Sequence, residues 1–302
     1  MRRLPAGLVA GILAYLLWGL FPLYWPLLAP AAPVEILAHR VLWSVVVVAM
    51  ILAVARGNGW IKSLGGRRLG LLTIAAALIS VNWGTFIYGV NSGRVVETSL
   101  GYFINPLVTV ALAVIVLGER LRRAQAIAVS IAAIAVVILA FDYGHMPWIA
   151  LTLAFSFGLY GLVRKHVGLD GIRSLAVEAA VLLPFAVVYL AWLSATGAST
   201  FGREGLAHAA LLAGAGITTA VPLMLFGAAA IRISLTTLGL LQYLAPTLQF
   251  LIGVFFYGEA LPGSRLAGFA LVWLALVIFT LDALKLPSRQ LPARVRTFAK
   301  NG

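Results

Sequence analysis

Apolar runs of about 20 residues follow one another along most of this chain, with short polar stretches between them. A helix of that length crosses the ~30 Å hydrocarbon core of a bilayer, because it rises about 1.5 Å per residue. Charged residues make up only 10% of the 302 residues, and the mean hydropathy is +1.04. So few charges cannot cover a water-soluble globule. The sequence therefore predicts an all-α integral membrane protein.

Ten such runs predict ten transmembrane helices, because backbone groups in lipid must pair within their own segment. The expected helices cover residues 5–28, 34–54, 70–91, 98–117, 124–141, 147–164, 175–194, 207–229, 236–257 and 264–284. A membrane β-barrel would instead show alternating segments of about ten residues. The first run is also longer than the apolar part of a signal peptide, so we expect this helix to be retained.

The positive charge is distributed unevenly between the two ends of these helices. With the N-terminus inside, 18 of the 22 Lys and Arg residues fall in inner segments. Only Arg94, Arg203 and Arg265 fall in outer segments, and Arg40 is left within a helix. This positive-inside pattern predicts that both termini are cytoplasmic. The net charge of +13 is thus an orientation signal and a contact for anionic lipids, and we expect no nucleic-acid partner.

The two halves of the chain resemble each other at an offset of about 140 residues: Pro106 matches Pro246, and Gly118-Glu119 matches Gly258-Glu259. We expect one five-helix repeat over residues 1–142, a second over 146–284, and a basic cytoplasmic tail over 285–302. Because five is odd, the second repeat enters the membrane from the opposite side. Inverted repeats of this kind form alternating-access transporters, which hold their substrate near the midplane.

Polar and aromatic side chains gather at the predicted midplane. A few polar groups within an aromatic wall are typical of a small-molecule site, because buried amides and hydroxyls need partners. The candidate substrate-binding residues are Trp18, Asn82, Trp83, Tyr102, Asn105, Gln242 and Tyr243. The alternative is that these groups only form hydrogen bonds between helices. The amides of Asn82, Asn105 and Gln242 favour the site, because amides are the costlier groups to leave unpaired.

Prolines predict breaks within several of these helices, at Pro22, Pro106, Pro222 and Pro246. A proline lacks the N–H that would bind the carbonyl four residues back. The carbonyls freed in this way belong to Trp18, Tyr102, Thr218 and Gln242. Such breaks either line a water-filled cavity or kink the helices for packing.

One ionisable cluster, Glu35, His39 and Arg40, lies near the outer end of the second predicted helix. Glu35 and His39 are four residues apart and therefore share a helix face. Because histidine titrates near neutral pH, the cluster is a candidate for proton coupling or for an outer gate. The other interpretation is a structural ion pair, with Arg40 reaching to the lipid headgroups.

Several of these stretches together resemble one family of permeases. They are Glu35-Ile-Leu-Ala-His39-Arg40, Asn82-Trp83, Leu100-Gly-Tyr-Phe-Ile-Asn-Pro-Leu107, Ala154-Phe-Ser-Phe-Gly-Leu-Tyr-Gly161 and Gln242-Tyr243 followed by Pro246-Thr247. The chain is similar to the RarD-type permeases of the EamA family, in the drug/metabolite transporter superfamily. The resemblance implies a ten-helix inverted bundle in a bacterial inner membrane that moves small metabolites or drugs. The family name is associated with chloramphenicol sensitivity.

The function we expect is secondary transport by alternating access, driven by protons if it is uphill. An uncoupled facilitator is the nearest alternative, and a membrane sensor, a scaffold or an integral-membrane lipid enzyme are others. The sequence has no cysteine and no nucleotide-binding or hydrolase motif, so we expect no enzyme activity, no metal and no cofactor. The expected partners are a small-molecule substrate and membrane lipids, and the sequence leaves open whether the chain forms a homodimer.

Overall fold

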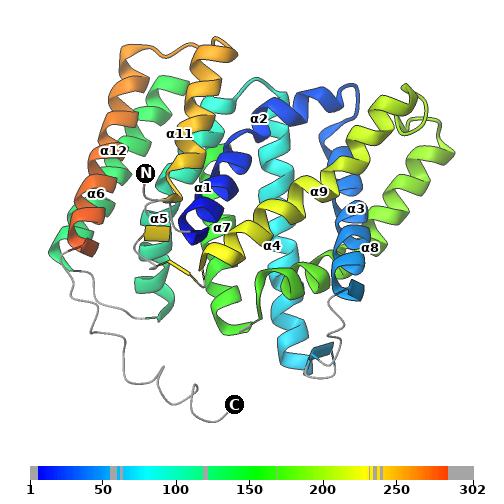
Figure 1. Ribbon diagram of the computed structural model, residues 1–302. Helices are drawn as coiled ribbons and strands as arrows, with labels where there is room; N and C mark the ends of the chain where they lie inside the picture. The colour runs from blue at the N-terminus through cyan, green and yellow to red at the C-terminus, as the bar shows by residue number, and fades with distance from the viewer. Residues whose placement is uncertain are drawn as a thin grey trace.

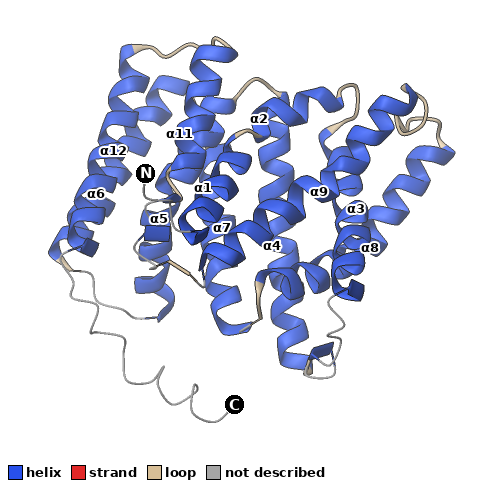
Figure 2. Ribbon diagram, in the orientation of Figure 1, coloured by secondary structure: helices blue, strands red, loops and turns tan. Residues whose placement is uncertain are grey.

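The computed structural model describes residues 6–54, 60–61, 64–117, 122–167, 169–230, 232–233, 237–238 and 241–284. Within these ranges the regular elements are all helices, as Figure 2 shows. The prediction of an all-α fold is therefore confirmed. The Gly118-Glu119 turn and the tail over 285–302 lie outside the described residues.

The first half begins with three short helices and continues with four long ones (Figure 1). They are α1 (Ala6–Gly19), α2 (Phe21–Tyr24), η1 (Trp25–Leu28), α3 (Pro33–Val54), α4 (Gly66–Asn91), α5 (Val95–Leu117) and α6 (Arg123–Tyr143). The second half contains α7 (Trp148–Val167), α8 (Gly171–Ala195), α9 (Gly205–Ala230), α11 (Leu244–Leu251), the π-helix η3 (Ile252–Phe256) and α12 (Gly263–Leu284). Each of the ten predicted runs overlaps at least one of these helices.

Helix length gives fewer membrane crossings than the pattern of apolar runs, because some helices are short. Among the described residues, seven helices are long and apolar enough to span a membrane. The first segment, bent by 43° between α1 and α2, adds an eighth span if it is taken as one. The segments Trp148–Arg164 and Leu244–Phe256 are apolar but shorter. A count of ten spans therefore stays a prediction.

Successive long helices run in alternate directions, so the loops fall at two ends of the bundle. Residues 29–32, 92–94, 144–147, 196–204 and 257–262 lie at the top of Figure 1. We name this the predicted outer end, because the charge distribution of the sequence predicts that these loops face outward.

The most extensive contacts between helices join the first half of the chain to the second, and they recur when the halves are exchanged. Helix α3 contacts α8 and α9, α4 contacts α7 and α8, and α5 contacts α7. Likewise α1 contacts α9 and α11, while α5 meets α11 and α6 meets α12. The counterparts in the two halves are α1 and α7, α3 and α8, α4 and α9, α5 and α11, and α6 and α12. The pairs named above are unchanged when each of these helices is exchanged with its counterpart. The two sequence-related halves therefore face each other across the centre of the bundle.

Large apolar side chains cover the outside of the bundle. Phe141, Phe185 and Leu206 are among them, each more than 70% exposed. Water would not solvate such a surface favourably, whereas lipid tails would. The buried polar side chains consequently stand out against an interior and an exterior that are both apolar.

Close contact between α5 and α7 depends on a glycine. A Cβ atom on Gly101 would lie 2.8 Å from the carbonyl oxygen of Ala150 and 2.8 Å from the Cβ of Leu153. The first of these obstacles is backbone and cannot move aside as a flexible side chain would. By contrast, a Cβ on Gly161 of α7 would meet nothing within 4 Å.

We therefore expect Gly101→Ala to lower the free energy of unfolding by roughly 1–3 kcal/mol, because it forces the two helices apart. The matched Gly161→Ala should raise it by about 0.5–1 kcal/mol, because alanine loses less entropy in a helix. Thermal unfolding of the two purified variants in detergent measures both changes. Equal stability of the two variants would contradict the close packing of α5 on α7.

Candidate functional site

Three helices meet at a hydrogen-bonded group of polar side chains in the interior. The Asn82 side chain of α4 donates to the Leu153 carbonyl (3.0 Å) and to Ser156 Oγ (3.0 Å), both on α7. Its Oδ1 accepts from the Tyr102 hydroxyl of α5 at 3.1 Å. Asn82 is 1% exposed. The structure thus brings together two of the predicted substrate-binding residues, Asn82 and Tyr102, and adds Ser156 to them.

A second polar group lies on α3, where Arg40 is buried in a cage of aromatic rings. Its Cζ lies 3.8 Å from the ring centre of Trp83, 5.2 Å from that of Trp25 and 5.7 Å from that of Phe21. Arg40 is 3% exposed, so it does not reach to lipid headgroups as one interpretation of the sequence held. Each of these rings attracts the guanidinium through its negative face.

Only one hydrogen bond holds the Arg40 guanidinium in the described part of the chain. Its Nε donates to Thr219 Oγ1 of α9 at 2.9 Å, and no carboxylate among the described residues pairs with it. This bond joins α3 of the first half to α9 of the second. A buried arginine without a carboxylate is unusual, because desolvation of a charge is costly unless it is paired.

Trp18 lies next to this cage. Together with Tyr102 it packs against the apolar cluster that contains Phe21 and Trp25. The Trp18 carbonyl, which Pro22 leaves without its helical N–H donor, accepts from the Gln249 side chain at 3.2 Å. Here the freed backbone group is satisfied by a side chain of the other half.

The remaining predicted substrate residues are less closely connected to this centre. Asn105 accepts from Thr109 at 3.2 Å, and its Nδ2 is buried without a hydrogen-bond partner among the described residues. Gln242 and Tyr243 lie in a turn before α11, and Tyr243 packs against the cluster that contains Phe103 and Phe250. The structure therefore leaves the amide nitrogen of Asn105 without a partner in the middle of α5. It places Tyr243 against a separate apolar cluster.

The four prolines occupy two kinds of position. Pro106 and Pro222 lie inside α5 and α9, which continue past them. Pro22 and Pro246 stand in the first turns of α2 and α11, a position that proline favours because its missing N–H would have no partner within the helix that it begins. The interruptions of the helical backbone thus fall before Pro22 and Pro246.

Glu35 and His39 face the loop before α9. The Glu35 carboxylate accepts from the Thr200 N–H (2.7 Å) and from Ser199 Oγ (3.3 Å), and no ion pair joins it to His39 within the described residues. The His39 ring stacks on Phe201, with ring centres 4.8 Å apart. Neither of its ring nitrogens has a hydrogen-bond partner in the described structure. The alternative interpretation of Glu35 and His39 as a structural ion pair is therefore wrong.

Two further carboxylates, at the predicted outer end, cap helix N-termini. Glu259 accepts from the backbone N–H groups of Val95 and Val96 at the start of α5, and Glu97 accepts from the Ile149 N–H at the start of α7. Burial raises the pKa of the Glu259 carboxyl, against the lowering effect of its N–H donors and of Arg265. We did not predict the role of Glu97 from sequence, although its place in the first turn of a helix is a recognisable signal.

These carboxylates border a polar hollow of about 230 Å³ at that end. Its lining residues are Gly93, Arg94, Glu97, Tyr143, His145, Glu259, Ala260 and Arg265. Arg265 pairs with Asp142 at 2.9 Å and so joins α12 to α6. The carboxylates and Arg265 that line this hollow already bind partners within the protein. We therefore do not assign the substrate to it.

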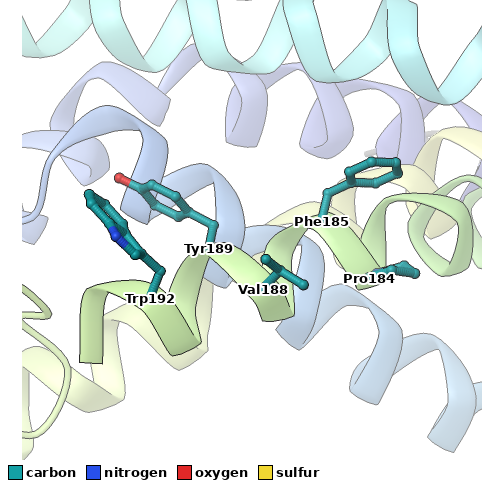
Figure 3. Close-up of a pocket in the computed structure, with 5 residues that line it drawn as sticks. All are labelled: Pro184, Phe185, Val188, Tyr189 and Trp192. Atoms are coloured by element: carbon teal, nitrogen blue, oxygen red, sulfur yellow. The ribbon is translucent and has the colours of Figure 1, made fainter. Parts of the chain in front are cut away.

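A larger hollow of about 470 Å³ lies along α8 and has a different character (Figure 3). Its lining side chains are Pro184, Phe185, Val188, Tyr189 and Trp192, all on one helix. Most of them are exposed, so the hollow belongs to the lipid-facing surface. Among the described residues no group of three or more acidic, His or Cys side chains is placed to hold a metal ion.

Polar groups buried at the centre of an apolar, all-helical bundle are typical of membrane transport proteins. Comparison with known proteins agrees with this class: residues 5–141 match the EamA-like transporter family. A protein from Streptomyces exfoliatus named Protein RarD is 56% identical over 85% of this chain and 82% of its own length. Protein RarD of Escherichia coli (strain K12) is 42% identical over 87% and 89%, and the "Uncharacterized transporter YojE" of Bacillus subtilis (strain 168) is 43% identical over 85% and 88%.

The chain belongs to the EamA-like transporter family, as a permease of the RarD type. Its apolar helices and its family make it a multi-pass inner-membrane protein. A solved structure titled "Crystal structure of protein" shares the fold, with a TM-score of 0.59 and 21% identity over 92% of this chain and 99% of that one.

The cap on α5 can be tested by removing its carboxylate. We expect Glu259→Ala to lower the free energy of unfolding by about 1–3 kcal/mol, because two helix N–H groups lose a charged acceptor. Glu204→Ala, which removes an exposed carboxylate at the same end, should change it by less than about 0.5 kcal/mol. Thermal unfolding of both variants decides the matter, and a Glu259→Ala variant as stable as Glu204→Ala would refute the cap.

Proposed function

We propose that the chain is a secondary transporter that moves a small metabolite or drug across the membrane by alternating access. The substrate would occupy the centre of the bundle, between the two halves. The observation that carries this proposal is the buried polar centre of Asn82, Tyr102 and Arg40. A protein that only had to fold in lipid would gain more from apolar side chains at these positions.

The sequence repeat and the packing pattern support an inverted arrangement of the halves, over residues 1–142 and 146–284. Contacts such as α3 with α9 recur as α4 with α8 in the exchanged halves. With an odd number of spans in each half, both termini and the basic tail over 285–302 would be cytoplasmic. The Arg40–Thr219 bond crosses between the halves, as a group that responds to their relative motion must do.

The unpaired Nδ2 of Asn105 and the interruption of regular helix by the turn at Gln242 and Tyr243 support a substrate region that extends toward α5 and α11. Unwound backbone at membrane depth is tolerated where it borders protein or a water-filled cavity. Trp18 and Trp83 would form the aromatic wall of this region. The halves would move about the interrupted segments before Pro22 and Pro246, with Pro106 and Pro222 bending α5 and α9.

Substrate contact at Asn105 and Gln242 can be tested by near-isosteric apolar variants. We expect Asn105→Leu and Gln242→Leu each to reduce flux by about tenfold or more, which corresponds to the loss of one buried hydrogen bond to substrate. Proteoliposomes preloaded with a mixture of amino acids, nucleosides and antibiotics, followed by mass spectrometry of the released compounds, measure the flux. Thr73→Leu, which replaces an exposed hydroxyl on α4, is the control and should transport normally.

Wild-type flux that survives in both leucine variants, at equal protein abundance, would be evidence for a sensor or a scaffold in place of a transporter. Flux that appears only in a lipid-modifying assay would instead favour the enzyme alternative. Each variant must first be shown to unfold at a temperature close to that of the wild type.

The energy source is the second part of the proposal. His39 and Glu35 would carry protons, and the unpartnered ring nitrogens of His39 leave it able to bind one. An uncoupled facilitator is the second candidate, because Glu35 already binds Thr200 and Ser199 and its carboxylate is not in contact with His39.

An imposed pH gradient separates the two. If coupling is correct, acidifying one side of the proteoliposomes drives substrate uphill, and His39→Gln abolishes this accumulation but leaves downhill exchange intact, because glutamine cannot be protonated at neutral pH. His145→Gln is the matched control, since His145 is an exposed histidine at the same end and its ring contacts the Met146 carbonyl and not the Glu35 and His39 cluster. Uphill accumulation that persists in His39→Gln would show that His39 does not couple transport to protons.

A further inference from the structure

Arg40 offers a positive charge to the centre of the bundle for which the described protein supplies no counter-charge. We infer that Arg40 binds a carboxylate group of the substrate, so that the transported compound is a small monocarboxylate with an apolar or aromatic body. This inference rests on the proposed function and names the chemical class of its substrate.

Burying the Arg40 guanidinium within the membrane costs free energy, and a bound anion would offset that cost. It is the eighth residue of α3, which places it about 10 Å from the start of that helix. A guanidinium stays charged under all physiological conditions, so the protein cannot avoid the cost of burial by releasing a proton. A residue that carries such a cost in the membrane is retained for a function or is paired with a partner. Arg40 has no carboxylate partner among the described residues.

Two half-buried arginines, Arg164 and Arg265, show the contrast. The Arg164 guanidinium of α7 pairs with Glu178 of α8 at 3.2 Å and donates to Tyr160 at 2.9 Å. Arg265 pairs with Asp142 at 2.9 Å. These two arginines are satisfied by the protein, whereas Arg40 is held by rings and by one hydroxyl. The rings orient the guanidinium without neutralising it.

The donors around Arg40 select the kind of ligand. Its Nε is bound to Thr219, and the Thr219 hydroxyl in turn donates to the Ala215 carbonyl. Within the described structure the only hydrogen bond of the guanidinium is the one from Nε, and Trp25, in the same cage, has a buried Nε1 without a partner there. Both groups only donate, so the complementary ligand is an acceptor that carries negative charge.

The number of charges favours a carboxylate over a phosphate. A phosphate monoester carries close to two negative charges at neutral pH, and it would need a second cation for balance. Arg40 is the one cation that the described contacts place in the cage. A single carboxylate matches that charge and fits the planar fork of a guanidinium. Trp83, the one partly exposed ring of the cage, would then offer apolar surface to the carbon skeleton of the ligand.

The experiment compares acids with their own amides. Purified protein is heated with acetate, benzoate or 3-phenylpropanoate, and in parallel with acetamide, benzamide or 3-phenylpropanamide. A ligand that binds the folded state raises the melting temperature. We expect at least one of the larger carboxylates to raise it, and its amide to bind about tenfold or more weakly, because the amide lacks the charge.

Three variants assign the effect to Arg40. Arg40→Gln should lose the preference for acid over amide, and Arg40→Lys should keep it with about tenfold weaker binding, because lysine has the charge but lacks the fork. Retained binding in Arg40→Lys also shows that the site is still folded. Arg203→Gln removes a charge from an exposed residue at the predicted outer end and should behave as the wild type.

The inference is overturned if no carboxylate of this set raises the melting temperature of the wild type, if an amide binds as well as its acid, or if Arg40→Gln keeps the preference. Its failure is distinct from that of the transporter proposal, because flux is a separate readout. Flux of a neutral compound that is lost in Asn105→Leu but normal in Arg40→Gln would keep the transporter and reject the anion site. Acid-selective binding without any flux would keep the anion site and reject the transporter.

Discussion

A chain surrounded by hydrocarbon has to satisfy its backbone hydrogen bonds from within, and this requirement shapes most of the polar contacts in the structure. Where a proline leaves the Trp18 carbonyl without its helical donor, the Gln249 amide of the other half supplies one. Where α5 and α7 begin, the carboxylates of Glu259 and Glu97 accept from the first N–H groups. Only nine acidic residues are present in the chain, and at least these two serve helix ends.

The polar groups at the centre are not explained by this requirement. The Asn82 side chain donates to Ser156 and accepts from Tyr102, and Arg40 stacks on aromatic rings. None of the three side chains caps a helix end. Burying these polar side chains costs free energy, and the packing of the helices alone does not require them. They therefore fit a place where a polar ligand enters and leaves. By contrast, the apolar hollow on α8 belongs to the lipid-facing surface. In the polar hollow at the predicted outer end, the carboxylates and Arg265 bind partners within the protein.

The pattern of apolar runs was sufficient to predict the helices, because lipid imposes one kind of regular structure on a spanning segment. The ten expected ranges coincide with helices to within a few residues; in the ninth, the described residues Thr237, Leu238 and Leu241 are helical, and α11 begins at Leu244 after a turn. Asn82 and Tyr102 were also recognisable, since a polar residue at midplane is informative in itself. Arg40 was placed in the right helix but with the wrong environment. Its cage comes from Phe21, Trp25 and Trp83, on two other segments, and only the packing of the helices brings them to it.

The central claim is that a water-filled chamber opens alternately to the two sides of the membrane at the depth of Asn105. The chain has no cysteine, so a single Asn105→Cys substitution provides a unique label site without further engineering. Reaction of this variant with a charged, membrane-impermeant thiol reagent, applied separately to each side of the membrane, measures the access directly. The account predicts modification from both sides, slowed by a bound substrate. Modification by an apolar maleimide alone, with none by the charged reagent from either side, would place Asn105 against lipid or in closed packing and would contradict it.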